Sequence, residues 1–200
     1  MNKILVTYAT LSGTTVEVAQ AVGEEIAKSG AQVDVLPVKQ VKSLDDYSGV
    51  VVGGPMIAGW HREALGFLRK HRNQLTSIPL AVFVTAMSLT TPSVAALEGV
   101  PLSIDDALPK PPAHPGKLTF RERYTRVENY ARPIIGALRP ARPVSIAFFG
   151  GRLEYGRLPW WGVLFVLLII QAPPGNKHNW PFIRNWAAGI APQLEVARKN

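Results

Sequence analysis

The chain has 200 residues, with 47% hydrophobic and 18% charged side chains, a composition typical of a folded protein of about one domain. It contains no cysteine, which excludes disulfide bonds, thiolate catalysis and cysteine-ligated zinc or iron–sulfur sites. The formal net charge is +8, and the whole excess lies in residues 101–200, which carry fourteen basic and six acidic side chains. This asymmetry favours an anionic partner for the second half, such as nucleic acid, a membrane surface or an acidic ligand.

Strand and helix patterns alternate in the first half. Short apolar runs predict strands at Lys3–Tyr8, Gln32–Val38, Val50–Val52 and Leu80–Ala86. Apolar residues at helical spacing predict helices over Thr15–Ser29 and His61–Leu75. This alternation is typical of βαβ units that build a parallel sheet.

The second half departs from this rhythm. Residues 88–118 contain six prolines, so we expect a long irregular connection there. A basic helix is predicted over Thr119–Leu138, a fifth strand over Val144–Gly150, and a closing helix from Trp180 to Val196. Between the last two lies an apolar and basic insertion, residues 151–179. The sequence shows no internal repeat, so we expect a single domain over residues 1–200.

No segment of the chain has the pattern of a membrane span. The N-terminal apolar stretch is interrupted early by Gly and Thr, which does not fit a secretory signal. The longest apolar run, Trp160–Ile170, would span roughly 16 Å as a helix, about half the hydrocarbon thickness of a bilayer. We therefore expect a cytoplasmic protein, with the inner membrane surface as a candidate location.

The turn after the first strand is the most informative segment. Its six residues are rich in hydroxyl groups and include one glycine: Thr10, Leu11, Ser12, Gly13, Thr14 and Thr15. Such a loop before a helix N-terminus can surround a phosphate with side-chain and backbone donors. It has no Lys, unlike the phosphate loop of nucleotide hydrolases, so it suits a terminal phosphomonoester. The alternative is that the hydroxyl groups only cap the helix.

The pattern T-x-S-G-x-T in this turn resembles the FMN-phosphate loop of the flavodoxin family. The run after the third strand resembles the loop that lies against the flavin ring in that family: Pro55, Met56, Ile57, Ala58, Gly59 and Trp60. The resemblance implies a flavodoxin-like α/β fold, with a five-stranded parallel sheet in the order 2-1-3-4-5, helices on both faces and a long insertion after the fifth strand. It also implies FMN as the cofactor, with its ring between that run and the residues after the fourth strand, Ala86, Met87 and Ser88.

A narrower resemblance points to quinone-linked protoporphyrinogen oxidases of the same fold. It is carried by the run GWHREALGFLRKHRNQL, by the R-x-P-x-W pattern that begins at Arg157, and by the closing NWPFIRNWA. This resemblance implies an enzyme of heme biosynthesis that transfers electrons from protoporphyrinogen IX to a quinone at the membrane surface. The alternatives are an NAD(P)H-dependent quinone reductase, a flavodoxin-type electron carrier without its own substrate, and a non-catalytic adaptor on this scaffold.

Two residues near the third strand have open interpretations. Trp60 is expected to stack on the flavin ring or to cap the following helix, and His61 is a weak candidate for a catalytic or orienting role. The four histidines have no metal-ligand spacing, so no metal site is expected.

The insertion combines the features of an interfacial membrane segment. Arg152 and Arg157 are expected to meet lipid headgroups, and an apolar surface is expected from Trp160, Trp161, Leu164, Phe165, Leu167, Leu168 and Ile169. The competing interpretation is that this run packs on the core or on a second subunit of a homo-oligomer. Nucleic acid is not expected, because the sequence contains no recognised binding motif for it.

Overall fold

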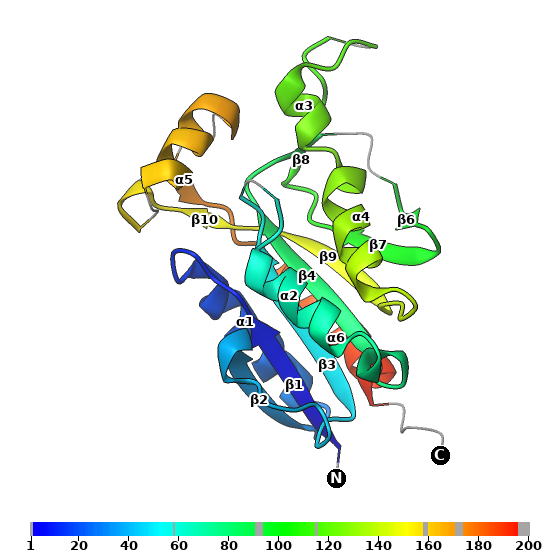
Figure 1. Ribbon diagram of the computed structural model, residues 1–200. Helices are drawn as coiled ribbons and strands as arrows, with labels where there is room; N and C mark the ends of the chain where they lie inside the picture. The colour runs from blue at the N-terminus through cyan, green and yellow to red at the C-terminus, as the bar shows by residue number, and fades with distance from the viewer. Residues whose placement is uncertain are drawn as a thin grey trace.

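The computed structural model describes residues 2–57, 59–90, 94–114, 116–157, 160–170 and 174–195. A central sheet is covered on one face by α1 (Thr14–Ala27) and α6 (Trp180–Leu194) and on the other by α2 (Arg62–His71) and α4 (Val127–Leu138), as Figure 1 shows. The remaining helices, α3 (Phe120–Tyr124) and α5 (Trp160–Phe165), lie beyond the sheet at the end where its parallel strands finish. The predicted α/β class is confirmed.

The strands of the main sheet are β1 (Lys3–Tyr8), β2 (Gln32–Pro37), β3 (Gly49–Pro55), β4 (Leu80–Ala86), β6 (Ala96–Leu97), β7 (Val100–Ile104) and β9 (Ser145–Gly150). Two small sheets pair β5 (Leu89–Thr90) with β8 (Pro109–Lys110), and β10 (Arg152–Leu153) with β11 (Gly175–Asn176). Shorter helical turns occur at Val38–Gln40, Gln74–Thr76 and Tyr155–Arg157, and a π-helical segment, Val166–Ile170, continues α5.

The central strands are apolar on both sides because helices cover both faces of the sheet. Every residue of β3, β4 and β9 is buried. Leu5, Val82 and Phe148 pack toward α2 and α4, whereas Phe83 and Phe149 pack toward α1 and α6. These two buried layers hold the sheet between the helices. Because β1, β3, β4 and β9 are paired in parallel, their carboxyl ends meet at one edge.

The predicted strand order is present within a larger sheet. The sheet runs β2-β1-β3-β4-β9-β7-β6, so the order 2-1-3-4-5 describes its first five strands. The additional strands come from the proline-rich connection, which was wrongly expected to be irregular. In β7, Leu102–Ile104 pair with β9, whereas Pro101 lies outside that pairing and its missing N–H breaks no bond to β9.

The predicted helix over Thr119–Leu138 is two helices. The chain turns at Thr125, whose hydroxyl lies 2.8 Å from the hydroxyl of Thr90 and whose carbonyl accepts a hydrogen bond from the Thr90 N–H. This tertiary contact ends α3 at Tyr124, and α4 begins at Val127. The helical spacing continues across the break, so periodicity alone does not reveal it.

The apolar run forms a short helical projection. It consists of α5 and the π-helical segment, and Figure 1 shows α5 standing away from the sheet. No helix among the described residues is long and apolar enough to cross a membrane.

We expect Gly53→Ala to lower the free energy of unfolding by about 2–3 kcal/mol, because overpacking a filled core carries a cost of this size. A Cβ at residue 53 would lie 1.9 Å from Phe83 Cζ, inside the layer against α1 and α6. The matched control is Gly66→Ala in the exposed part of α2, where a Cβ meets nothing within 4 Å. That control should raise stability by about 0.5–1 kcal/mol. Denaturant unfolding of both apoproteins measures the change in the free energy of unfolding. Equal changes in the two variants would contradict the packing argument.

Candidate functional site

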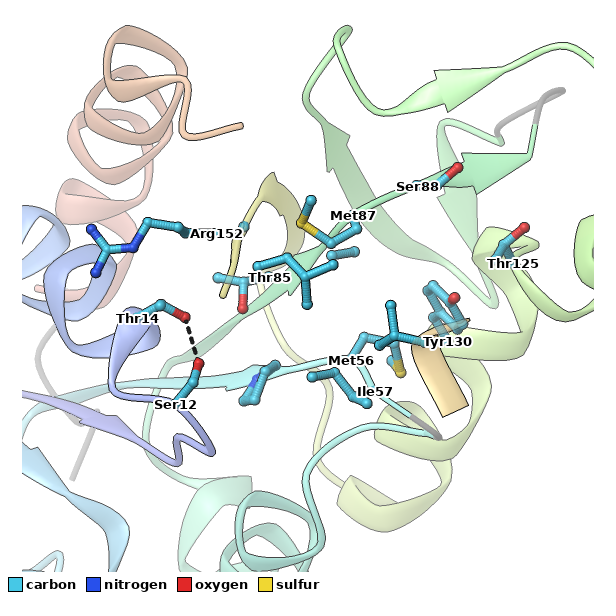
Figure 2. A pocket seen from close by; sticks show the side chains of 15 residues that line it. Ser12, Thr14, Met56, Ile57, Thr85, Met87, Ser88, Thr125, Tyr130 and Arg152 are labelled. Atoms are coloured by element: carbon cyan, nitrogen blue, oxygen red, sulfur yellow. Dashed lines mark hydrogen bonds between the residues drawn. The ribbon is translucent and has the colours of Figure 1, made fainter. Parts of the chain in front are cut away.

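A pocket opens at the carboxyl ends of the central strands, where ligands bind in open α/β sheets. Figure 2 shows side chains from several separate parts of the chain around it. The lining residues are Ser12 and Thr14 after β1; Pro55, Met56 and Ile57 around the end of β3; Thr85, Ala86, Met87 and Ser88 around the end of β4; Gly151, Arg152 and Leu153 after β9; and Thr125, Tyr130 and Val166 from the later helical segments. The structure thus brings together eight of the fifteen residues predicted after the first, third and fourth strands, two of them from the loop after the first strand.

The loop after β1 has free donors at the start of α1. Gly13 is the N-cap residue with a φ of 82°, a left-handed conformation that favours glycine, and no side chain caps the helix. Its N–H donates to Thr10 Oγ1 at 2.9 Å, which shapes the loop, and the hydroxyls of Ser12 and Thr14 lie 3.3 Å apart. The capping interpretation of these hydroxyl groups is therefore wrong for the side chains that the structure describes.

Thr15 does not line the pocket, but it lies in the first turn of α1 directly after the loop. Its side chain is fully buried, and its hydroxyl oxygen has no hydrogen-bond partner among the described residues. A buried hydroxyl without a partner carries a desolvation cost that a bound acceptor would remove. Together with the N–H groups at the start of α1, which no side chain caps, it fits the phosphate of FMN.

The opposite end of the pocket is apolar. Leu153 and Val166 form a small buried cluster with Ile57, Met87 and Tyr155 packed against it. This end suits the flat ring system of a flavin, whose dimethylbenzene part is apolar, whereas the phosphate loop suits its charged tail.

Hydrogen bonds fix the loop after β4. Lys177 Nζ donates to the carbonyl of Met87 at 2.9 Å, and the Gly151 N–H donates to the carbonyl of Ala86 at 2.9 Å. Burial lowers the pKa of Lys177, and the charge of Lys110 adds to this shift. The pocket wall is therefore held in place by the chain that returns from the insertion.

Two predicted site residues lie away from the pocket. Trp60 is only 4% exposed, and its Nε1 donates to the carbonyl of Gly54 at 3.1 Å, so the indole is in the core instead of on the pocket wall. His61 caps α2, with its Nδ1 accepting from the Glu63 N–H at 3.3 Å. Burial lowers the pKa of His61, and the charge of Glu63 opposes this shift. The lowered pKa favours the neutral ring, whose Nδ1 can accept a hydrogen bond.

The other predicted residues are less informative. Thr10, Leu11, Gly13 and Thr15 are not among the residues that line the pocket. The carbonyl of Gly59 accepts a hydrogen bond from the Ile57 N–H within the loop after β3. Ala58 lies outside the described residues.

Sequence reasoning missed several residues of the pocket. Thr85 is one residue from the end of β4, so its place on a parallel strand was a usable signal. Thr125, Tyr130 and Val166 approach from distant segments, and no local pattern marks them. Arg152 was expected at a lipid surface, but it lies in the pocket and forms ion pairs there.

We expect Thr15→Val to weaken FMN binding about tenfold to hundredfold, the size of one lost hydrogen bond to a charged group. The same change should leave the stability of the apoprotein equal or higher, because it removes a buried hydroxyl that has no partner there. Flavin-fluorescence titration measures the affinity, and denaturant unfolding measures the stability. A destabilised apoprotein with unchanged FMN affinity would assign Thr15 to the fold instead of the ligand.

Comparisons with known proteins identify the family of the chain. The family model described as "Flavodoxin domain" matches residues 5–178. Among solved structures, the chain is similar to a flavodoxin from the domain Archaea, with 12% identity over 96% of this chain and 98% of that chain and a TM-score of 0.49. It is also similar to an oxidoreductase from Corynebacterium diphtheriae, with 16% identity over 97% of both chains and a TM-score of 0.48. A comparison with curated proteins gives no match.

These structural scores and identities are low, so the assignment rests on the family model, which spans most of the chain. The residues of the loop after β1 fit the phosphate of the cofactor that this family binds. The chain belongs to the flavodoxin domain family, and FMN is its cofactor.

Proposed function

We propose that this flavodoxin-domain protein is an FMN-dependent oxidoreductase that takes electrons from a reduced lipophilic substrate and passes them to a quinone at a membrane surface. The substrate that the narrower resemblance suggests is protoporphyrinogen IX. FMN supplies the redox chemistry when bound, and the protein supplies the phosphate loop, the apolar walls and the route by which substrates arrive.

The observation that carries the proposal is the two-sided apolar segment formed by α5 and the π-helical residues after it. Val166 is buried and lines the pocket. On the same segment, Leu164, Leu167 and Leu168 are exposed, and Trp160 is 78% exposed. One segment thus forms both a wall of the flavin pocket and an apolar surface open to solvent.

A second element extends this surface. Phe165 of α5 meets Tyr124 of α3 edge-on, with ring centroids 5.9 Å apart, and Tyr124 stacks on Phe120 at 6.5 Å. Phe120 is itself 65% exposed. Large exposed apolar side chains on neighbouring elements are typical of interaction surfaces. We name the set Trp160, Leu164, Leu167, Leu168 and Phe120 the apolar rim.

Charge supports an anionic lipid bilayer as the partner of the apolar rim. Lys117 lies before α3 and Arg123 lies within it, and both are exposed and close in sequence to Phe120. Basic residues at an anionic surface contribute about 1 kcal/mol each, and each buried apolar side chain contributes about 1.5–3 kcal/mol. A lipophilic quinone or porphyrinogen would then reach the pocket from the bilayer. The side chains of Arg157 and Trp161, also expected at the lipid, lie outside the described residues.

Anaerobic mixing of the FMN-loaded protein with candidate donors tests the activity. We expect protoporphyrinogen IX to bleach the flavin absorbance and a soluble menaquinone analogue to restore it. NADPH should leave the absorbance unchanged. Bleaching by NADPH alone would instead assign the protein to the quinone reductases, and no bleaching by either donor would indicate an electron carrier.

Flotation with anionic liposomes tests the membrane surface. We expect the wild type to float at low salt, and Trp160→Ser/Leu164→Ser/Leu168→Ser to stay at the bottom, because the variant loses several kcal/mol of apolar burial. The matched control is Gln20→Ser/Glu24→Ser/Lys28→Ser, which introduces three serines at the same spacing at exposed positions of α1 and its C-cap residue. This control should float. A wild type that remains folded and yellow at the bottom of the gradient would overturn the membrane proposal.

A further inference from the structure

Arg152 is the one charged side chain among the described residues that line the pocket. It follows Gly151 after β9, and its backbone is held in the small β10–β11 sheet, where it pairs with Asn176. Figure 2 shows its guanidinium beside the first turn of α1, on the side of the pocket that holds Ser12 and Thr14. The fold therefore brings a positive charge from the end of β9, three strands away from β1 in the sheet, to the first turns of α1.

Two carboxylates hold this guanidinium. Its Nη2 lies 2.9 Å from Glu17 Oε1, and its Nε lies 2.8 Å from Glu154 Oε1. The Arg152 side chain is 22% exposed, less than either partner. The cluster of one cation and two anions has a net negative charge close to the loop that receives a phosphate. Glu17 lies one turn into α1, so its negative charge would repel a phosphate bound at the loop. A contact between the Arg152 guanidinium and the phosphate would offset this repulsion.

A histidine beside this pair does not add positive charge. Burial lowers the pKa of His178, with Glu17 opposing the shift and Arg152 adding to it, so its environment disfavours the charged imidazole. Its ring packs against Trp180, with ring centroids 4.7 Å apart. The compensating charge for a phosphate in this part of the pocket thus comes from Arg152.

We propose that Arg152 is a ligand of the FMN phosphate and that Glu17 competes with the phosphate for the same guanidinium N–H groups. The proposal rests on FMN binding with its phosphate on Thr10–Thr15. A guanidinium has several N–H groups in one plane, so it can stay ion-paired with Glu154 while the two Nη groups, which face Glu17 in this structure, form a bidentate contact with phosphate. Arg152 is a binding residue here, and the flavin ring does not enter the argument.

Titration of the apoprotein with FMN and with riboflavin, which lacks the phosphate, tests this assignment. We expect Arg152→Gln to weaken FMN binding about tenfold to hundredfold and to leave riboflavin binding unchanged. Glu17→Gln should tighten FMN binding, because it frees the guanidinium and removes a negative charge near the phosphate. The double variant should keep most of the loss of Arg152→Gln, because the ligand itself is missing.

Two results would overturn the role of Arg152 and leave the assignment of the phosphate to Thr10–Thr15 intact. Equal weakening of both flavins would show that Arg152 supports the fold of the pocket. Recovery of wild-type FMN affinity in the double variant would show that Arg152 only neutralises Glu17. A wild type that binds riboflavin as tightly as FMN would remove the phosphate from the loop, and with it both this inference and the assignment beneath it.

Discussion

The site depends on a close approach of two backbones at the end of β9. A Cβ at Gly150 would lie 1.9 Å from the carbonyl oxygen of Lys177, so only glycine allows the returning chain to lie there. Hydrogen bonds continue the contact, from the Lys177 N–H to the carbonyl of Gly151 and from the Gly151 N–H to the carbonyl of Ala86. The insertion is thereby anchored to the carboxyl end of the sheet, and everything it contributes to the pocket follows from this anchor.

The anchored insertion gives the pocket two ends of different polarity. Arg152 forms an ion pair with Glu17 of α1, whereas Leu153 belongs to the apolar cluster with Val166. Because successive residues of a strand point to opposite sides, one short strand serves both ends. This arrangement matches the polarity of FMN, which joins a charged phosphate to a largely apolar ring.

Strand positions that depend on local sequence pattern could be predicted from the sequence. The bounds of β1 and β4 agree with the prediction residue by residue, because continuous apolar runs between turns leave little freedom. Tertiary contacts decided the rest. Pairing of Thr125 with Thr90 divides a periodic helix, and pairing with β9 makes a strand of a proline-rich segment. Arg152 beside an apolar run resembles a lipid-facing residue until Glu17, 135 positions away, is seen to hold it.

The apolar rim is weakly supported by the rest of the protein. The segment Trp160–Ile170, which carries most of the rim, packs on the pocket through a cluster with two buried members, Leu153 and Val166. The hydrophobic clusters on the two faces of the sheet contain many more buried residues. A helix as short as α5 is not stable by itself in water, since helix stability in proteins comes mostly from the packing of an apolar face. Most of the apolar side chains of this segment that the structure describes face solvent instead of the core. A lipid surface would supply the missing packing, and it would order the same segment that forms the wall of the flavin pocket.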